Sequence, residues 1–352
     1  MLALACASSE PCLGRKECGI LEKERIRIGV VGLGKMGLLH ASILNFFPEV
    51  RLAALCDKSG LMVRLASKVF SRSGINVVSD LEKLVDLDLD AVYVTTPISS
   101  HSFIARNIYK SGVARHLFVE KTLASSYIEA DELCRLVPQE SVNMVGYMKR
   151  FSVTFGKAKD LLSQGTFEEV SSFKAYAYSS DFMGDNKASR TSAARGGALR
   201  DLGCHVIDLA LWFFGDFKVI SVTNESAAGN SVSFRVRRSD GLEGEFDISQ
   251  CKKDYRMPEI GLSIHGSKGA IEVNDDRVRL EESNKGKLAT WYRHDLNDNV
   301  DFWLGETEYF REDQHFIKSI LTHENCEPSF LTASKVDFIV DQVRHTHGLE
   351  FK

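Results

Sequence analysis

The sequence predicts an α/β protein that begins with a doubly wound parallel sheet, and three features predict this fold class. Between residues 26 and 146, short β-branched runs alternate with segments of helical spacing. The first run passes directly into a turn with glycines at positions 32, 34 and 37. At residues 166–178 and 217–282, apolar and polar residues alternate, as in strands that pack one face and expose the other. The 352 residues are enough for two domains.

The first half of the chain is predicted to contain strands separated by helices. Residues 26–31 are β-branched and lie between charged residues and a glycine, which is typical of a buried parallel strand. The helix that follows stops before Pro48. We expect strands at residues 26–31, 50–56, 75–78, 91–95, 117–119 and 142–146, and helices at residues 38–47, 60–71, 80–85, 99–111 and 124–136.

Composition and charge exclude several classes of function. The net charge is −4 and no basic stripe stands out, so we expect no nucleic-acid partner. No apolar run approaches the roughly 18 residues of a membrane helix, and the first residues lack the basic start of a signal peptide. The 8 cysteines show neither a CxxC pair nor a zinc spacing. We therefore expect free thiols, no metal site, no membrane contact and a cytoplasmic location.

Between a strand and a helix, the three glycines have separate roles in binding a dinucleotide. Gly32 permits the tight turn, Gly34 lets a pyrophosphate approach the backbone, and Gly37 lets the helix pack closely on the strand. The phosphates then lie at the helix N-terminus, where we expect the backbone of Lys35 and Met36 to contribute. A glycine turn without a ligand is the alternative interpretation.

Asp57 ends the second predicted strand, 20 residues after the last glycine, where an acidic residue holds the ribose hydroxyls. Its negative charge repels a 2′-phosphate, which favours NAD over NADP. Lys58 and Arg64 are near enough in the sequence to keep NADP as an alternative. The plainer interpretation of Asp57 is a surface aspartate.

Two further strand ends carry polar residues, and ligands bind beyond the carboxyl ends of such strands. Thr96, Pro97 and His101 follow the fourth strand, and Glu120 and Lys121 follow the fifth. Burial beside a nicotinamide would lower the pKa of Lys121 and suit it to a proton relay or a hydrogen-bond donor. The alternative is a solvated loop lysine that pairs with Glu120.

A third group of polar residues begins a predominantly apolar helix in the second half of the chain. Asp201 and His205 are four residues apart, so they share a helix face, and Asp208 lies one turn further along that face. Burying a carboxylate and an imidazole costs free energy, so their presence there needs a reason. The structural alternative is that Asp201 caps the helix and His205 is a hydrogen-bonded core histidine.

Taken together, these motifs resemble the glucose–fructose oxidoreductase / inositol dehydrogenase (Gfo/Idh/MocA) family over residues 25–347. Their order along the chain is the same as in that family. The segments that carry the resemblance are Gly32-x-Gly34-x-x-Gly37, Thr96-Pro97-x-x-x-His101, Glu120-Lys121, residues 146–151, Asp201-x-Gly203-x-His205-x-x-Asp208 and residues 266–273.

The resemblance implies a Rossmann domain at residues 25–148 and a substrate and oligomerisation domain at residues 149–352, built on a large, open, mostly antiparallel sheet. It implies a homo-oligomer, a dimer or tetramer, through that sheet. Residues 1–24 are expected to be a poorly ordered extension. Lys121, Asp201 and His205 become the catalytic set, with Glu120 and Lys121 also touching the cofactor. The family usually has proline where this chain has Thr122, so we expect a trans or reshaped turn there, because a cis bond before a non-proline residue costs about 2.5–4 kcal/mol.

Substrate-binding residues are expected near the junction of the two domains. Tyr147 is predicted to donate a hydrogen bond to the substrate and Arg150 to bind it, beside Asp201 and His205. The alternatives are that Tyr147 only packs and that the cations are solvated or paired with acids. Further cations expected at the substrate mouth are Lys149, Lys187, Arg190, Arg195 and Arg200. The last helix is predicted at residues 332–345, with Phe338, Ile339 and Val343 on the core side.

The predicted function is hydride transfer between NAD (or NADP) and a secondary alcohol or ketone of a sugar, cyclitol or sugar derivative. In this hypothesis His205 takes the hydroxyl proton, Asp201 orients the imidazole, and Lys121 hydrogen-bonds the oxygen. One alternative is a regulatory or interaction protein that binds a dinucleotide without turnover. Another is an NADPH-dependent reductase acting on an oxo-sugar.

Overall fold

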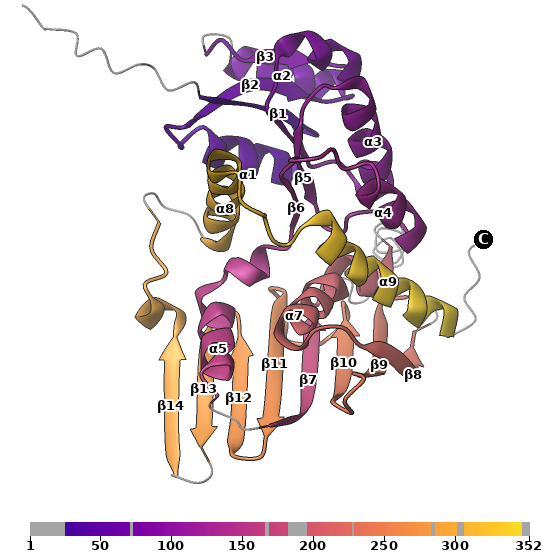
Figure 1. Ribbon diagram of the computed structural model, residues 1–352, viewed down its shortest axis with the longest axis vertical. Helices are drawn as coiled ribbons and strands as arrows, with labels where there is room; N and C mark the ends of the chain where they lie inside the picture. The colour runs from indigo at the N-terminus through magenta and orange to yellow at the C-terminus, as the bar shows by residue number, and fades with distance from the viewer. Residues whose placement is uncertain are drawn as a thin grey trace, which may run out of the picture.

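The computed structural model describes residues 25–70, 73–165, 169–181, 196–226, 229–282, 286–300 and 306–346. These residues form two sheets, one above the other in Figure 1, with helices between and around them. The predicted extension at residues 1–24 and three of the predicted mouth cations, Lys187, Arg190 and Arg195, lie outside the described residues. None of the described helices has the length and apolar character needed to cross a bilayer.

The first sheet is parallel and has six strands in the order β3-β2-β1-β4-β5-β6. The strand order reverses between β1 and β4, and a crevice for a ligand forms at such a reversal. This confirms the predicted doubly wound sheet. Its strands are β1 (Ile26–Val31), β2 (Val50–Cys56), β3 (Asn76–Val78), β4 (Ala91–Val94), β5 (His116–Glu120) and β6 (Asn143–Gly146).

Two of the helices beside the first sheet, α2 (Gly60–Val69) and α4 (Tyr127–Cys134), begin after a serine that caps them. Helix α4 starts after Ser126, whose hydroxyl accepts a hydrogen bond from the Glu129 N–H at 3.3 Å, so it is shorter than the predicted 124–136. Helix α1 begins at Lys35, directly after the glycine turn and not at residue 38. The segment predicted as a helix at 80–85 is a 3₁₀-helix, Leu81–Leu87. The helices are α1 (Lys35–Leu44), α2 (Gly60–Val69), α3 (His101–Ser111) and α4.

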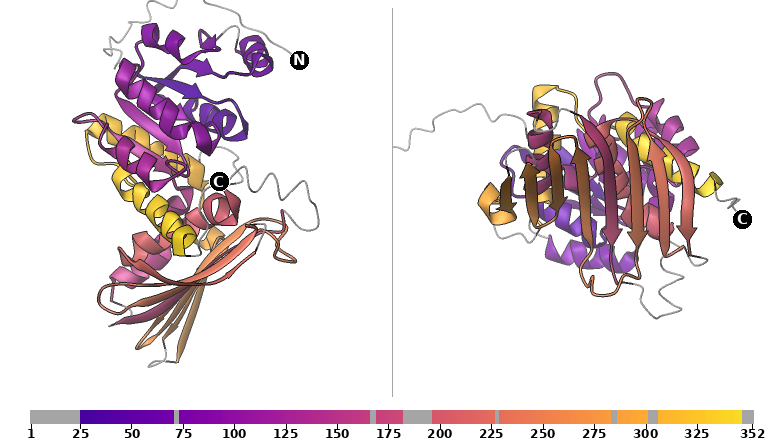
Figure 2. Two further views of the ribbon diagram at one scale, coloured as in Figure 1. Left: turned by 90° about the vertical axis from the view of Figure 1, so that its right-hand side faces the viewer. Right: turned by 90° about the horizontal axis from the view of Figure 1, so that it is seen from below.

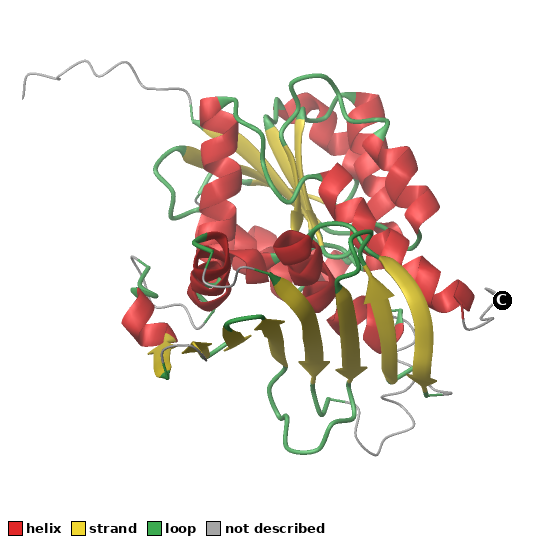
Figure 3. Ribbon diagram, turned by 60° about the horizontal axis from the view of Figure 1, so that its bottom comes forward, coloured by secondary structure: helices red, strands yellow, loops and turns green. Residues whose placement is uncertain are grey.

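The second sheet has eight strands in the order β14-β13-β12-β11-β7-β10-β9-β8, and only β7 and β10 pair in parallel. This confirms the predicted mostly antiparallel sheet. Alternate residues of β11, such as Ile260, Leu262 and Ile264, are buried on the side of α7 (Cys204–Phe214), and α5 (Val153–Ser163) packs on β12 and β13. The opposite face carries no described helix (Figures 2 and 3). The strands are β7 (Val170–Tyr178), β8 (Lys218–Glu225), β9 (Ser231–Arg237), β10 (Glu243–Ser249), β11 (Glu259–Gly266), β12 (Gly269–Asn274), β13 (Arg277–Glu282) and β14 (Lys287–Tyr292).

The last two helices connect the two halves of the molecule. Helix α8 (Glu308–Thr322) packs on α1, and its Phe316 and Ile317 share a core with Ile28 of β1. The sequence analysis does not predict that α8 packs on the first sheet, because it assigns all of residues 149–352 to the second domain. Helix α9 (Phe330–Thr346) contacts α4 of the first half and α7 of the second (Figure 1).

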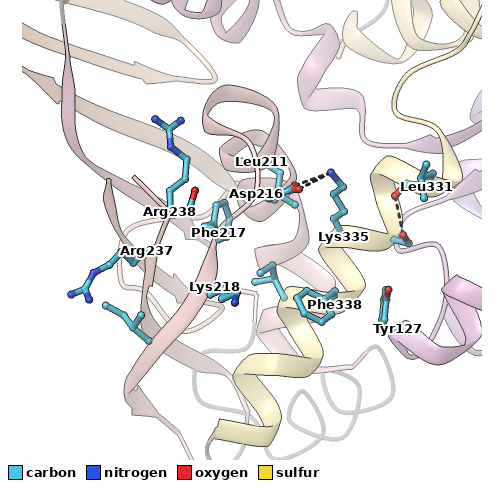
Figure 4. Close-up of a pocket in the computed structure, with 14 residues that line it drawn as sticks. Tyr127, Leu211, Asp216, Phe217, Lys218, Arg237, Arg238, Leu331, Lys335 and Phe338 are labelled. Atoms are coloured by element: carbon cyan, nitrogen blue, oxygen red, sulfur yellow. Dashed lines mark hydrogen bonds and ion pairs between the residues drawn. The ribbon is translucent and has the colours of Figure 1, made fainter. Parts of the chain in front are cut away.

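Helix α9 covers the predicted 332–345, but one of its three predicted core residues is not buried. Ile339 and Val343 are buried, as predicted, whereas the side chain of Phe338 is 38% exposed. Phe338 lines a cavity of about 700 Å³ between α9 and β8 (Figure 4). The prediction for Phe338 is therefore wrong. The spacing of apolar residues shows which face of a helix is apolar, but it does not show how far a neighbouring element covers that face. None of the predicted site residues lines this cavity.

Candidate active site

The glycine turn after β1 has the geometry that a dinucleotide requires. Gly32 has a φ of +98°, and a Cβ there would lie 2.9 Å from the Thr95 carbonyl. A Cβ on Gly37 would lie 1.8 Å from the carbonyl oxygen of Gly32, so only glycine fits at that position. A Cβ on Gly34 would meet nothing within 4 Å, so the backbone there faces open space. Two glycines thus close the turn and the third leaves its outer surface accessible.

The start of helix α1 is suited to an anion. Its N-cap is Gly34, which makes no side-chain capping bond, and the first turn contains no acidic residue. Gly34 and Lys35 are exposed and Met36 is half-buried, so the first residues of this turn lie at the surface. The unpaired N–H groups and the helix dipole favour a phosphate at this end. The residues present therefore fit the pyrophosphate of a dinucleotide.

Asp57 is tied to the glycine turn. One of its carboxylate oxygens accepts a hydrogen bond from the Leu33 N–H at 2.6 Å, and the other accepts from the Ser59 N–H at 2.7 Å. The carboxylate therefore lies at the end of β2 beside the turn, where it can also accept a bond from a ribose hydroxyl. Lys58 and Arg64 are exposed.

The loop after β4 closes against the glycine turn. The Thr95 hydroxyl donates to the Gly32 carbonyl at 2.7 Å, and the Thr96 methyl would touch a Cβ on Gly32. The two ring nitrogens of His101 lie 2.7 Å from the carbonyl oxygen of Thr96 and 2.8 Å from that of Thr122. His101 is fully buried and joins two loops, which argues against its predicted direct contact with the cofactor. The neighbouring Pro97 is exposed.

The peptide bond between Lys121 and Thr122 is cis. The expectation of a trans bond at this turn is therefore wrong. Hydrogen bonds hold Thr122 on both sides, since its carbonyl accepts from His101 and its hydroxyl donates to the Ala124 carbonyl at 3.0 Å. The sequence pattern could not reveal this conformation, because one of the two partners, His101, comes from the start of α3.

Lys121 and Asp201 lie together, as predicted, although they are 80 residues apart. The Lys121 Nζ donates to the Asp201 carbonyl at 2.5 Å and to its carboxylate at 3.2 Å. Burial acts to lower the pKa of Lys121, but the nearby Cys204 and Asp201 side chains raise it above its usual value. The predicted proton relay through a lowered pKa is thus not supported, and the ammonium is a hydrogen-bond donor.

Gln250 is a site residue that the sequence analysis missed. Gln250 directly follows β10 and is buried, and its amide donates to the second carboxylate oxygen of Asp201 at 3.1 Å. The carboxylate therefore bonds Lys121 with one oxygen and Gln250 with the other. These contacts make Asp201 an anchor for Lys121, whereas the sequence-based hypothesis assigns it to orienting His205. No motif marks Gln250, which follows β10 without distinctive neighbours.

His205 and Tyr147 bring two buried polar atoms without partners to the same place. Residues Leu199–Gly203 form a π-helix that leads into α7, and His205 lies in the first turn of α7. The ring of Tyr147 meets that of His205 edge-on, with centroids 6.3 Å apart. Among the described residues, His205 Nδ1 and the Tyr147 hydroxyl have no hydrogen-bond partner. Both groups can therefore serve a ligand.

Burial sets the protonation states of these two groups. It lowers the pKa of His205 well below its usual value, and the charges of Lys121 and Lys149 act in the same direction. Burial also raises the pKa of Tyr147 well above its usual value. At neutral pH the imidazole is therefore an uncharged base and the phenol keeps its proton.

Two of the predicted mouth cations are instead committed to buried ion pairs. The Arg150 guanidinium donates to both carboxylate oxygens of Asp208, at 2.8 Å and 2.6 Å, and the two side chains are 6% and 1% exposed. Lys149 bridges Asp275 at 2.8 Å and Glu308 at 2.9 Å. Arg150 thus braces helix α7, which argues against its predicted role in binding substrate. Neither pairing is visible in the local sequence.

Arg200 is likewise a structural residue. Its guanidinium donates to Asp337 and, at 3.0 Å, to Asp341, both on helix α9. It also donates to the Ala124 carbonyl at 2.7 Å and to the Thr122 hydroxyl at 3.3 Å. With only 2% of its surface exposed, Arg200 fixes the active-site turn to α9 and does not face a substrate mouth.

Comparison with known proteins places the geometry in context. A family model described as an oxidoreductase family with an NAD-binding Rossmann fold matches residues 26–147. A model of the GFO/IDH/MocA C-terminal domain matches residues 155–272.

Relatives and solved structures agree with these matches. Levoglucosan dehydrogenase of Pseudarthrobacter phenanthrenivorans is 24% identical over 91% of this chain and 95% of its own length. Inositol 2-dehydrogenase of Rhizobium meliloti is 25% identical over 86% of this chain and 91% of its own. The structure of a levoglucosan dehydrogenase in complex with NADH superposes with a TM-score of 0.81 at 21% identity, covering 92% of this chain and 97% of that one. The two domain matches, the strand order and the glycine turn lead to one conclusion: this chain belongs to the Gfo/Idh/MocA family of oxidoreductases with an NAD-binding Rossmann fold.

Proposed function

We propose that this protein is an NAD-dependent dehydrogenase that acts on a secondary alcohol of a sugar, cyclitol or sugar derivative. One observation carries the proposal. The Nδ1 of a neutral His205 and the Tyr147 hydroxyl are buried and without partners among the described residues, and the charge of Lys121, which bonds Asp201, acts on His205. Buried polar atoms are normally paired, so unpaired ones mark a place for a ligand. The glycine turn that fits a dinucleotide lies at the same edge of the first sheet.

The residues divide the work of alcohol oxidation. Bound nicotinamide supplies the acceptor for the hydride that leaves the alcohol carbon. The neutral imidazole of His205 takes the hydroxyl proton, because burial leaves it as a base. An ammonium has three donors, and the two contacts of Lys121 with Asp201 use two of them, so the remaining N–H can bond the substrate oxygen. Tyr147 donates a second hydrogen bond and helps to orient the alcohol.

The named relatives support this substrate class. They include a levoglucosan dehydrogenase, an inositol 2-dehydrogenase and the NAD-dependent scyllo-inositol 2-dehydrogenase of Bacillus subtilis, which is 28% identical over 65% of this chain and 63% of its own length. The Asp57 carboxylate beside the glycine turn repels a 2′-phosphate, which favours NAD. NADP remains the alternative cofactor, since another relative is an NADP-dependent scyllo-inositol 2-dehydrogenase.

We further propose a cytoplasmic homo-oligomer, a dimer or tetramer, with no nucleic-acid or membrane partner. The face of the eight-stranded sheet that carries no described helix is available for a second copy (Figure 2). The described cysteines are all free thiols, which agrees with a reducing compartment.

A turnover assay tests the proposed function. Purified protein is incubated with NAD or NADP and a panel of sugars and cyclitols, and the absorbance of the reduced nicotinamide is followed. We expect reduction with NAD and at least one polyol. Tight NADH binding without turnover on any member of the panel would instead favour the regulatory alternative.

A further inference from the structure

A buried histidine connects the cofactor-binding half of the site to the far C-terminal helix α8. His40 lies on α1 and is fully buried. Its Nδ1 lies 2.8 Å from an oxygen of Asp313, on α8, and its Nε2 lies 3.0 Å from Glu120, at the end of β5. A neutral imidazole has only one N–H, whereas two ionised carboxylates only accept hydrogen bonds. When both carboxylates are ionised, only an imidazolium with both nitrogens protonated satisfies these two contacts.

The surroundings hold the ring of His40 in one orientation. Its centroid lies 5.1 Å from that of Phe118, 5.5 Å from Tyr93 and 5.9 Å from Tyr309. Three aromatic rings packed at these distances around a fully buried imidazole restrict its rotation. These three rings therefore help to keep one imidazole nitrogen on each carboxylate.

Glu120 connects His40 to the backbone of Lys121, the proposed catalytic lysine. One carboxylate oxygen of Glu120 lies on His40, and the other accepts a hydrogen bond from the Lys121 N–H at 3.0 Å. A Cβ on Gly146 would come within 3.3 Å of that second oxygen, so the glycine leaves Glu120 its space. From the same backbone position, the side chain of Lys121 reaches Asp201. An unbroken chain of contacts therefore runs from α8 to the Lys121 ammonium.

We propose that His40 is a positioning residue: as an imidazolium held by Asp313, it keeps Glu120 ionised and in place, and Glu120 fixes the turn that presents Lys121. This inference rests on the proposed function, because the value of a fixed Lys121 lies in that reaction. It assigns to α8, which begins more than 180 residues after Lys121, a part in the active site. Neither His40 nor Asp313 touches the reacting atoms.

The pKa directions of His40 and Glu120 agree with the geometry, whereas burial keeps the pKa of Asp313 above its usual value although His40 acts to lower it. Burial acts to lower the pKa of His40, yet Asp313 and Glu120 raise it well above its usual value. Burial acts to raise the pKa of Glu120, yet the bond to His40 lowers it. Glu312, whose two buried carboxylate oxygens have no partner in the described part of the chain, has a pKa raised well above its usual value by burial. The charged or titratable groups that face His40 and Glu120 are Tyr93 on β4, His101 on α3, Lys121 after β5, and Tyr309, Glu312 and Asp313 on α8.

The first test measures the protonation of His40 directly, in full-length protein without nucleotide or substrate. Nitrogen-15 NMR of the histidine rings is recorded from pH 6 to pH 9, and His40→Asn identifies the His40 signals. We expect two protonated ring nitrogens at pH 8. A single bare nitrogen at pH 7 would overturn the proposal. If His40→Asn does not fold, Asp313→Asn replaces it, and the expected result is a His40 ring that loses its proton at lower pH than in the wild type.

The second test separates positioning from general stability. Loss of the imidazolium raises the pKa of Glu120, so the acid limb of the kcat–pH profile should move up by about one unit in His40→Asn, with a loss of about tenfold in kcat. The matched control is Phe316→Leu, which loosens the same core without changing a charge. We expect the control to lower the melting temperature and leave the acid limb in place. Identical profiles in the two variants would overturn the proposal.

The design also distinguishes failure of this inference from failure of the proposed function. If the wild type shows no turnover on any polyol, the proposed function fails. The NMR measurement then still decides the state of His40, and the pH dependence of NADH binding replaces kcat in the comparison of His40→Asn with Phe316→Leu. A NADH affinity that responds to pH alike in both variants would count against the positioning role.

Discussion

His205 and Lys121 lie close together in different protonation states: the imidazole is neutral and the ammonium is protonated. Burial and two neighbouring cations keep the imidazole neutral, whereas the Asp201 carboxylate helps to keep the lysine protonated despite its burial. A base and a cationic donor are thus available at the same pH, because the environment moves the two pKa values apart. At the scale of single residues, this separation is the basis of the proposed chemistry.

The Lys121 side chain is expected to matter for turnover more than for cofactor affinity. Lys121→Ala removes the donor to the substrate oxygen, and we expect kcat to fall by about 10²–10⁴-fold. The NADH dissociation constant, measured by fluorescence titration, should change only a few-fold. Lys83→Ala is the control, since Lys83 makes an exposed ion pair with Asp80. A near-normal kcat in Lys121→Ala would remove Lys121 from the mechanism.

The depressed pKa of His205 has a consequence for stability. In the folded protein the pKa of His205 lies well below its usual value of about 6.5. At pH values between the two pKa values, the unfolded chain therefore binds more protons than the folded protein. Stability contributed by the neutral imidazole is therefore present above about pH 6.5 and is lost as the pH falls below it. We expect His205→Asn, which cannot titrate, to lose less melting temperature than the wild type between pH 7.5 and pH 5. Equal losses in both proteins would contradict this assignment.

At the scale of elements, the start of helix α1 combines two different demands on glycine. Gly37 is needed for packing, because a Cβ there would overlap the Gly32 carbonyl. Gly34 has open space outside it, so its lack of a side chain serves whatever approaches from that side. In this short segment, the packing of the fold requires glycine at position 37, and we expect the approach of a ligand to require it at position 34.

Alanine substitutions separate these two demands. Gly34→Ala should leave the melting temperature nearly unchanged and weaken NADH binding at least about tenfold, since a methyl group displaces a pyrophosphate oxygen from the helix N-terminus. Gly37→Ala should instead destabilise the folded protein strongly. Gly156→Ala in α5, where a Cβ also meets nothing, is the control for alanine itself. NADH affinity in Gly34→Ala equal to that of the control would place the pyrophosphate elsewhere.

At the scale of the whole molecule, the C-terminal helices make the two sheets one structure. Helix α8 completes the core of the first sheet, and α9 receives the buried guanidinium of Arg200, which also holds the active-site turn. The site is therefore assembled from segments at both ends of the described chain. Packing of α8 and α9 is a condition for the site as well as for stability.

The Arg200–Asp337 pair tests this dependence. Asp337→Ala removes the fully buried one of the two carboxylates that pair with Arg200 and leaves Asp341 as the other, so we expect a loss of about 3 kcal/mol in the free energy of unfolding. Replacing both residues, as in Arg200→Met with Asp337→Leu, should recover a large part of that stability while kcat stays low, because Met cannot hold the Ala124 carbonyl. Chemical denaturation and steady-state kinetics measure the two effects. Full recovery of kcat in the double variant would show that Arg200 does not support the turn.

The sequence alone determined the features that depend on neighbouring residues. The strand–turn–helix at Gly32–Gly34–Gly37, the carboxylate of Asp57 at the end of the next strand, and the alternation of the second sheet all follow from local spacing, and the structure confirms their placement. The proximity of Lys121 and Asp201 was predicted from the family resemblance, and the structure shows it.

Only the tertiary structure decided the partners of buried charges. Arg150 pairs with Asp208 across 58 residues, Lys149 with Glu308 across 159, and His40 with Asp313 across 273. A charge in the sequence shows that a partner is needed when the residue is buried, but it does not say which one the fold supplies. For the same reason the cis bond before Thr122 and the return of α8 to the first sheet were not predictable, since both depend on contacts that exist only after the chain has folded.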